Sequence, residues 1–298
     1  MMNSKKCSIE DKDCIAVLLT VHNRKIKTLS CLEKLFKENS NKYVLQVYLT
    51  DDGCTDSTKD AVKSKWPEVE IIDGDGSLFW NRGMRAAWER AAVDDPDFYL
   101  WLNDDTELMS DSIQRLLDCS KGFENRAIIV GSTYESKDKL DYSYGGRLKI
   151  HNNPRVYPDK YIAKKCDVFN GNIVLIPRYV FDIVGYNDNY YRHSFGDFDY
   201  GISAGLKGIE SYVAPGYYGY CKRNNPIPLF RRKCNNLVKR YKLLYSPWGY
   251  NPFEDFHLNI KYQPFYKCIW YFIKLHINVL FTINHIKYEP ISTVSGGE

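Results

Sequence analysis

The chain has 298 residues, of which 44% are hydrophobic and 26% charged, with a formal net charge of +4 at pH 7. These values are ordinary for a soluble globular protein, and the length allows one α/β domain of about 220 residues with a smaller appendage. The nine cysteines follow no metal-ligand spacing, which favours reduced thiols in a cytosolic setting. Residues 1–13 are polar and lack an apolar core, which excludes a signal peptide and predicts a short disordered lead-in.

The first 105 residues contain three short apolar segments of β-favouring composition, and each ends in polar side chains. Helical stretches separate the three segments. This βαβ series predicts an α/β fold, with a mostly parallel, Rossmann-like sheet flanked by helices. In this part we expect strands at 15–20, 44–50, 69–72 and 98–102 and helices at 26–39, 57–65 and 83–93.

The remainder of the chain is less regular. Residues 132–168 show no clear period and are predicted to form a loop or hairpin. We expect a domain at 14–224, followed by a helical, basic and aromatic extension at 225–298. The further elements are strands at 127–131, 173–176 and 209–213, and helices at 111–120, 178–184, 197–206, 228–245 and 264–284.

The polar side chains that follow the strands form the candidate site. Asp51 and Asp52 follow the second apolar segment, and Asn103, Asp104 and Asp105 follow the third. Open α/β sheets bind ligands at this end of their strands, and hard oxygen ligands suit Mg²⁺ or Mn²⁺, which usually arrive with a phosphate. No glycine-rich phosphate loop follows any of the three strands, so phosphate binding through a metal is favoured. The alternatives are a turn-capping role for Asp51 and Asp52 and a helix-capping role for Asp105.

The chain resembles the inverting family 2 glycosyltransferases of GT-A fold, of the bacterial surface-polysaccharide or rhamnosyltransferase-like type. The resemblance rests on three ordered motifs, Thr20-Val-His-Asn-Arg24, Asp51-Asp-Gly-Cys-Thr-Asp56 and Asn103-Asp-Asp105. The segment from Gly74 to Met84 is similar to the one that precedes the donor-lining helix in many bacterial members, and Phe195-Gly-Asp-Phe-Asp-Tyr200 is similar to an acceptor-side motif. The resemblance covers roughly residues 14–220.

This resemblance implies transfer of a sugar, with inversion, from a nucleoside-diphosphate sugar to a hydroxyl of a glycan or lipid-linked acceptor. It implies a metal on Asp105 and on Asn103, which replaces the first aspartate of the commoner motif, and it places Asp104 near the donor ribose or sugar. Asp52 would accept the imide N–H of uracil or thymine, which favours UDP- or dTDP-sugars. Arg24 as a surface charge and Trp80 as a core residue remain alternatives to donor binding. The implied donor pocket is lined by Thr20, Asn23, Arg24, Trp80, Asn81 and Gly83.

Asp197 is the catalytic base that the resemblance implies, because it aligns with the family's acidic motif. A positioned carboxylate that removes the acceptor proton typically contributes about 10²–10⁴-fold. The alternative is that Asp197 and Asp199 only complement a helix amino terminus. Where many family members carry a histidine this chain has Tyr217 and Tyr218, so a third protein ligand to the metal is left open, with His193 as one candidate.

The C-terminal extension is rich in basic and aromatic residues. Eight basic and no acidic residues lie between Lys222 and Lys242, and lysines interrupt the apolar segment 265–281. A spanning helix needs about 20 nearly uninterrupted apolar residues, so we expect an amphipathic helix that binds a membrane surface, its own domain or a homodimer partner. No nucleic-acid recognition motif accompanies the basic residues.

The predicted setting is bacterial capsule, O-antigen or cell-wall polysaccharide synthesis, in the cytoplasm or peripherally on the inner face of the cell membrane. Two rival functions remain. A sugar nucleotidyltransferase would need a glycine-rich basic loop after the first strand, which Thr20-Val-His-Asn-Arg24 does not provide. A non-catalytic scaffold of GT-A fold would tolerate Asn103 and Gly196, which depart from the catalytic pattern.

Overall fold

The computed structural model describes residues 12–38, 42–149, 154–224, 229–231 and 236–281. The chain divides into two compact units. Unit 1 comprises residues 1–189 and 197–223, and unit 2 comprises residues 190–196 and 224–298. Most of the predicted lead-in at 1–13 lies outside the described residues, and Asp13 already belongs to the first strand.

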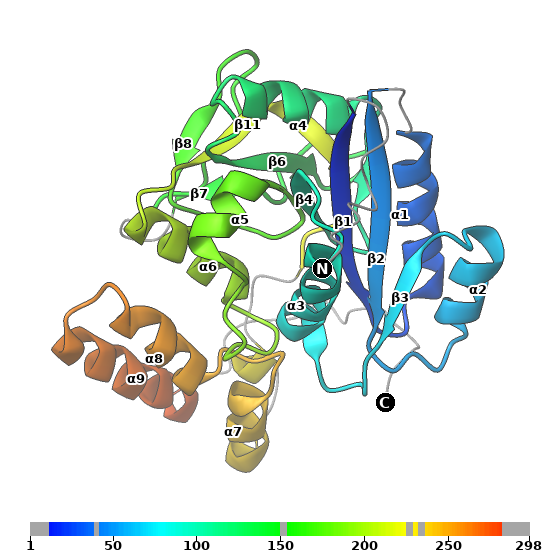
Figure 1. The fold of residues 1–298 in the computed structure, drawn as a ribbon. Coiled ribbons are helices and arrows are strands. Elements are labelled where there is room, and N and C mark those ends of the chain that lie inside the picture. The colour runs from blue at the N-terminus through cyan, green and yellow to red at the C-terminus, as the bar shows by residue number, and fades with distance from the viewer. Residues whose placement is uncertain (1–11, 39–41, 150–153, 225–228, 232–235, 282–298) are drawn as a thin grey trace, which may run out of the picture. The chain divides into compact units, whose positions relative to one another are not determined.

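Unit 1 is built on a mixed sheet with the order β3-β2-β1-β4-β10-β6-β11-β5, in which β8 also pairs with β11 (Figure 1). The strands β3, β2, β1 and β4 are parallel, β10 runs antiparallel to β4 and β6, and β11 is parallel to β6. The strands are β1 (Asp13–Val21), β2 (Tyr43–Asp51), β3 (Glu70–Asp73), β4 (Phe98–Leu102), β5 (Glu107–Leu108), β6 (Ile128–Tyr134), β8 (Lys164–Cys166), β10 (Ile173–Pro177) and β11 (Ser211–Tyr220).

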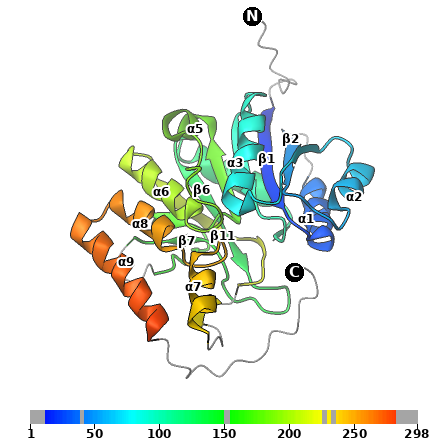
Figure 2. The same cartoon turned by 90° about the horizontal axis from the view of Figure 1, so that it is seen from below.

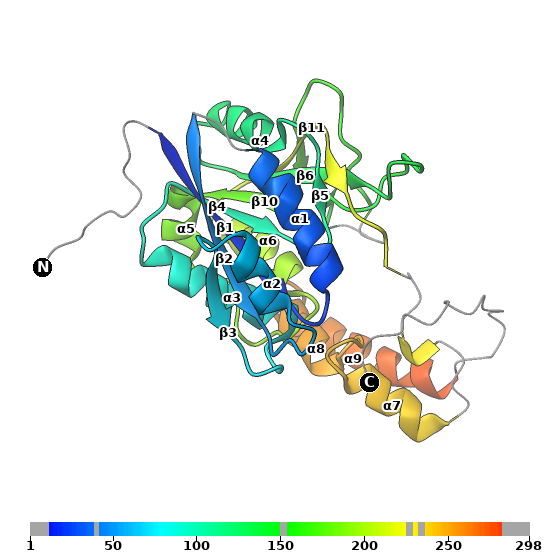
Figure 3. The ribbon, with the colours of Figure 1, turned by 90° about the vertical axis from the view of Figure 1, so that its right-hand side faces the viewer.

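Helices cover both faces of this sheet, which confirms the predicted α/β fold. Alternate residues of β1 enter separate cores, with Ile15 and Val17 in one and Ala16 and Leu18 in the other. A strand buried on both faces reads as a continuous apolar segment, which is why the sequence shows no alternation there. The first core contains residues of α1 (Lys25–Lys37), α2 (Thr58–Lys65) and α4 (Ser112–Lys121), of which α1 and α4 are seen over the sheet in Figure 3. The second contains residues of α3 (Phe79–Ala92), α5 (Arg178–Val184) and α6 (Gly196–Leu206).

Two local predictions and one alternative reading differ from the structure. Helix α3 begins at Phe79 rather than near residue 83, because a carboxylate distant in sequence accepts the N–H groups at its start. Asp105 is not a helix cap, since α4 starts after Asp111. Cys14 is disulfide-bonded, so the prediction that all cysteines are reduced is wrong at that position. Within the predicted loop or hairpin at 132–168, β7 (Gly146–Arg147) pairs antiparallel with β9 (Val168–Phe169).

Unit 2 is helical (Figure 2). Its elements are the 3₁₀ turn η1 (Leu229–Arg231) and the helices α7 (Leu237–Tyr245), α8 (Pro252–Ile260) and α9 (Phe265–Leu280). Helix α8, which the sequence reading missed, starts at an Asn251 cap followed by proline, a recognised start signal. Phe253 and Phe256 of α8 pack against Phe272 of α9. Within the described residues, every helix is too short or too polar to cross a bilayer.

Candidate functional site

The loops after β1 and β2 are joined at the carboxyl-terminal edge of the parallel strands. The backbone N–H of Asp52 donates to Val21 O at 2.9 Å, and that of Thr55 donates to Asn23 Oδ1 at 2.7 Å. Asn23 has a φ of +51°, a left-handed conformation that asparagine adopts more readily than most residues. Asn23 therefore fixes the relation between two loops of the site, and its predicted contact with the donor stays a prediction.

A cavity of about 300 Å³ opens between the loops after β2 and β3. Its walls are polar and come from Asp51, Gly53, Cys54, Thr55, Ser57, Lys59, Asp60, Asp73 and Gly74. The cavity lies at the sheet edge where open α/β folds bind ligands, and the acidic residues that follow β4 do not line it. It provides space for a ligand group next to the loop that Asn23 holds.

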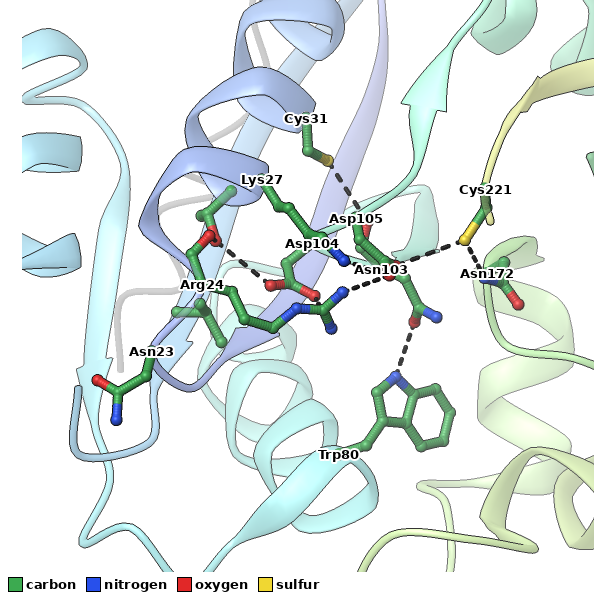
Figure 4. Close-up of polar contacts among 12 residues, drawn as sticks. Asn23, Arg24, Lys27, Cys31, Trp80, Asn103, Asp104, Asp105, Asn172 and Cys221 are labelled. Carbon is green, nitrogen blue, oxygen red and sulfur yellow. Dashed lines mark hydrogen bonds and ion pairs between the residues drawn. The ribbon is translucent and has the colours of Figure 1, made fainter. Parts of the chain in front are cut away.

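Asp104 and Asp105 both contact the guanidinium of Arg24 (Figure 4). Arg24 Nη1 lies 3.0 Å from Asp104 Oδ1, and Nη2 pairs with Asp105 Oδ2. Lys27 lies one helical turn further along α1, and its Nζ is 3.9 Å from the same Asp105 oxygen. Two cations from the start of α1 thus face two carboxylates from the end of β4.

Burial governs the electrostatics of this group. The Asp104 side chain is only 6% exposed, and burial raises its pKa to about 7 although the neighbouring Arg24 guanidinium acts to lower it. Thr28 Oγ1 donates to Asp104 Oδ2 at 3.3 Å. Burying a carboxylate is costly without a cation beside it, and the Arg24 guanidinium provides that positive charge here.

The donor atoms at the end of β4 fit a hard divalent cation that a phosphate completes. They are the Asp105 carboxylate and the Asn103 amide oxygen, and Mg²⁺ is commonly held by one or two carboxylates together with water and substrate phosphates. Among the described residues, no group of three or more His, Cys, Asp or Glu side chains is arranged to hold a metal by itself. His193 belongs to unit 2, where it packs against Trp248 with ring centroids 4.4 Å apart.

The Trp80 side chain lies between the end of β4 and the residues that contact the start of α6. Its Nε1 donates to Asn103 Oδ1 at 2.8 Å, and its ring meets Trp101 edge-on with centroids 5.8 Å apart. A Cβ atom added to Gly171 would come within 2.4 Å of the Trp80 ring, so the Gly171 backbone lies directly against the indole. The Gly171 N–H in turn donates to Asp197 Oδ2 at 3.0 Å. Asn103 and Asp197, distant in sequence, therefore lie close to the same aromatic side chain.

Asp197 is partly buried in the first turn of α6. Its carboxylate accepts from the backbone N–H of Gly171 and, at 2.9 Å, from that of Phe198. Burial raises its pKa to about 6, and these N–H groups limit the rise because they favour the charged form. A carboxylate with this pKa is largely ionised at neutral pH and is a stronger base than an exposed aspartate.

Asp52 holds the loop that leads into α3. Its Oδ1 accepts from the N–H groups of Gly76 and Leu78 at 2.9 and 3.2 Å, and its Oδ2 accepts from Phe79 N at 2.8 Å. The residue is 2% exposed, and Phe79 has a φ of +55°, a strained value for a bulky residue. Both oxygens of Asp52 thus shape the loop, and its predicted bond to a base stays a prediction.

Three residues predicted to line the donor pocket pack inside unit 1. A Cβ atom on Gly83 would lie 2.1 Å from Thr20 Oγ1, so the missing side chain lets α3 approach β1. Asn81 is fully buried, and its Nδ2 donates to Asp188 O at 2.8 Å while Asn187 Nδ2 donates back to its Oδ1 at 2.6 Å. All three residues therefore have packing or loop-fixing contacts, and their predicted contact with the donor stays a prediction.

Two residues at the site, Cys221 and Lys27, were not predicted from the sequence. Cys221 Sγ lies 3.5 Å from Asp105 Oδ1, and Asn172 Nδ2 donates to the same sulfur at 3.3 Å (Figure 4). No sequence signal marks Cys221, because it reaches Asp105 through the fold alone. Lys27 could have been found, since it stands three residues after Arg24 and so shares its side of α1.

Comparison with known proteins identifies the family of the chain. The family described as Glycosyl transferase family 2 matches residues 16–184, more than half of the chain. No curated protein matches the chain by sequence. The alignment with the structure of S. aureus TarS covers 44% of that longer chain.

Three solved structures share the fold. A mannosyltransferase, PcManGT from Pyrobaculum calidifontis in complex with GDP-Man and Mn²⁺, is 14% identical with a TM-score of 0.56, and the alignment covers 91% of this chain and 73% of that one. GalNAc-T7 with UDP, GalNAc and Mn²⁺ is 12% identical with a TM-score of 0.54, over 89% and 55%. S. aureus TarS 1–349 with UDP-GlcNAc is 13% identical with a TM-score of 0.52, over 91% and 73%. The sheet, its acidic loops and the matched residues together show that the chain belongs to glycosyl transferase family 2, with a GT-A fold.

Proposed function

We propose that this protein transfers a sugar, with inversion, from a nucleoside-diphosphate sugar to a hydroxyl of a glycan or lipid-linked acceptor. One observation carries the proposal: the acidic group after β4 and the carboxylate of Asp197 are joined through Trp80 and Gly171. The first supplies a place for a cation and a diphosphate, and the second supplies a base. The reaction needs both near one sugar carbon.

The diphosphate would bind at the end of β4, next to Arg24 and Lys27. These side chains carry the positive charge that two phosphates need, and Arg24 has the planar fork that recognises phosphate well. Asp105 and Asn103 would hold Mg²⁺ or Mn²⁺, and a bound ion supplies Lewis-acid stabilisation of the departing diphosphate. Two of the similar structures were solved with a nucleotide or nucleotide sugar and Mn²⁺, which supports this assignment.

Asp197 would act on the acceptor. The acceptor oxygen attacks the anomeric carbon from the face opposite the diphosphate, the bond to the diphosphate oxygen breaks, and the hydroxyl proton passes to an Asp197 carboxylate oxygen. The two backbone N–H donors hold that carboxylate in one orientation. A single displacement of this kind inverts the anomeric configuration, and no covalent sugar–enzyme intermediate is needed.

The donor we favour is a UDP- or dTDP-sugar, with the nucleoside near Asn23, Asp52 and the cavity between the loops after β2 and β3. The similar structures with UDP-GlcNAc and with UDP support a uridine nucleotide, and the one with GDP-Man makes guanosine the alternative to be tested. We place the reaction in surface-polysaccharide synthesis, because the basic unit 2 suits an acceptor carried on an anionic surface.

A panel of UDP-, dTDP- and GDP-sugars tests the proposal by thermal shift, with and without Mn²⁺, followed by product analysis by NMR. A bound donor should stabilise the protein by a few kcal/mol at saturation. Asp197→Asn should keep this shift and lose turnover, whereas Asp182→Asn, a change of the same type outside the site on α5, should keep both. A protein that shows no shift with any donor, or an Asp197→Asn variant with normal turnover, would refute the assignment.

A further inference from the structure

Helix α9 exposes an apolar face that no described residue of unit 2 covers. Six of its side chains define this α9 face, each 40–68% exposed: Tyr266, Ile269, Trp270, Ile273, Ile277 and Leu280. At 3.6 residues per turn they fall within an arc of about 100°. By contrast, only Cys268 and Val279 of this helix are buried. An exposed apolar stripe of this length marks a surface that binds something.

The charges of unit 2 identify what it fits. Its only acidic residues within the described part of the chain are Glu254 and Asp255, and both are buried. Glu254 pairs with Arg192 at 2.9 Å, and Asp255 is hydrogen-bonded to Tyr250. The exposed charged side chains described in this unit are therefore all basic. They are Lys239 and Lys242 on α7 and Lys274 on α9.

The lysines of α9 lie beside the apolar arc rather than within it. Lys274 falls about 40° beyond Trp270 in helical projection, and Lys267 about 20° further. A helix with an aromatic and aliphatic face edged by lysines has the pattern of one that lies in the interface of an anionic bilayer. The apolar face enters the acyl boundary while the ammonium groups stay at the level of the headgroups.

We propose that the α9 face docks this protein on an anionic membrane surface, with the helix parallel to the bilayer plane. A second copy of the chain is the other simple occupant. A two-fold dimer through this face would bring two identical basic surfaces together, whereas an anionic lipid surface complements them. The inference uses residues of unit 2 alone and does not depend on the chemistry proposed for unit 1.

Co-sedimentation with vesicles tests the docking surface. The full chain should bind phosphatidylcholine–phosphatidylglycerol vesicles at least tenfold more tightly than phosphatidylcholine vesicles, and added salt should weaken the binding. The double variant Ile273→Glu/Ile277→Glu should lose at least tenfold of this binding, and Lys267→Gln/Lys274→Gln should lose much of the preference for anionic lipid. The matched control is Val93→Glu/Leu206→Glu, which adds the same charge at exposed apolar positions of unit 1 and should bind as the parent does.

Three results would contradict membrane docking through the α9 face. Equal binding by the α9 variant and its control overturns the proposal, provided that both unfold at the parent's temperature. Failure of the parent to bind any vesicle also overturns it. If instead the parent forms a dimer in solution that Ile273→Glu/Ile277→Glu dissociates, the face belongs to a second copy. The donor-induced thermal shift should be the same in all four proteins, so loss of membrane binding is separable from failure of the proposed function.

Discussion

Replacing Arg24 with methionine tests how the acidic group at the end of β4 is stabilised. Methionine keeps much of the side-chain length and removes the charge. The variant leaves Asp104, whose side chain is 6% exposed, and Asp105, at 18%, without the guanidinium that contacts both. Lys27→Met is the matched control, because Lys27 is 61% exposed and its Nζ lies 3.9 Å from Asp105.

The expected loss follows from burial. Removing one partner of a fully buried ion pair costs about 3–5 kcal/mol, whereas exposed pairs contribute about 0–1 kcal/mol. Arg24 is 37% exposed, so solvent screens part of the interaction, and we expect Arg24→Met to lower the free energy of unfolding by about 2 kcal/mol. For Lys27→Met we expect a loss below about 0.5 kcal/mol.

Urea unfolding measures these losses, and a double-mutant cycle assigns them. Asp104→Asn in the Arg24→Met background should recover at least half of the loss, because it removes the buried carboxyl that without Arg24 must either take up a proton or stay unpaired. Mn²⁺ alone should raise the unfolding temperature of Arg24→Met more than that of the parent, because the carboxylates are no longer neutralised by arginine. Equal losses for Arg24→Met and Lys27→Met, with no recovery in the double variant, would show that the pair does not act as described.

Four further predictions concern other residues of unit 1. Because burial raises the pKa of Asp197 to about 6, kcat/KM should fall as the pH drops below about 6 and the base takes up a proton. If kcat/KM does not change between pH 5 and pH 8, Asp197 is not the base. The pKa of Asp197 lies above its unfolded value of 3.8, so this carboxyl lowers the free energy of unfolding as the pH rises from about 4 to about 6. Asp197 keeps some solvent contact, which reduces the effect. In urea unfolding, Asp197→Asn should therefore be about 1–2 kcal/mol more stable than the parent near neutral pH and no more stable near pH 4. Gly83→Ala should cost about 1–3 kcal/mol in the same assay because its Cβ would collide with Thr20, whereas Gly205→Ala in α6, with open space around its Cβ, should cost nothing. Trp80→Phe removes the indole N–H that donates to Asn103, and should weaken Mn²⁺ binding in a titration. It should change the free energy of unfolding by less than about 1.5 kcal/mol. An unchanged Mn²⁺ affinity would show that Asn103 is not a metal ligand.

The order of the elements in unit 1 was predictable because each strand carries its own signal. Residues 15–20, 44–50 and 98–102 are mostly apolar, and the structure has β1, β2 and β4 there. Helix boundaries were harder, as α3 shows. Its start is fixed by the carboxylate of Asp52, which lies 26 and 27 positions before the Leu78 and Phe79 N–H groups that it accepts, so no local pattern announces it.

The roles within the site divide in the same way. The sequence picked out Arg24, Asn103, Asp104 and Asp105, and the structure brings them together. It also picked out Thr20, Asn81 and Gly83, whose contacts are with other parts of unit 1. Residue type and position could not reveal these contacts, because the partner residues are distant in sequence, and the predicted contact of Thr20, Asn81 and Gly83 with the donor stays a prediction.

By itself, the sequence determined that an α/β sheet carries acidic loops at the ends of its second and fourth parallel strands, since hydrophobic runs and the residues after them are local properties of the chain. Only the tertiary structure decided which charges meet, that Arg24 faces Asp104 and Asp105 across 80 and 81 positions, and that Gly171 and Trp80 join Asp197 to Asn103. Electrostatic pairing and burial depend on distances in space, and these are set by how strands of the sheet lie beside one another rather than by spacing along the chain.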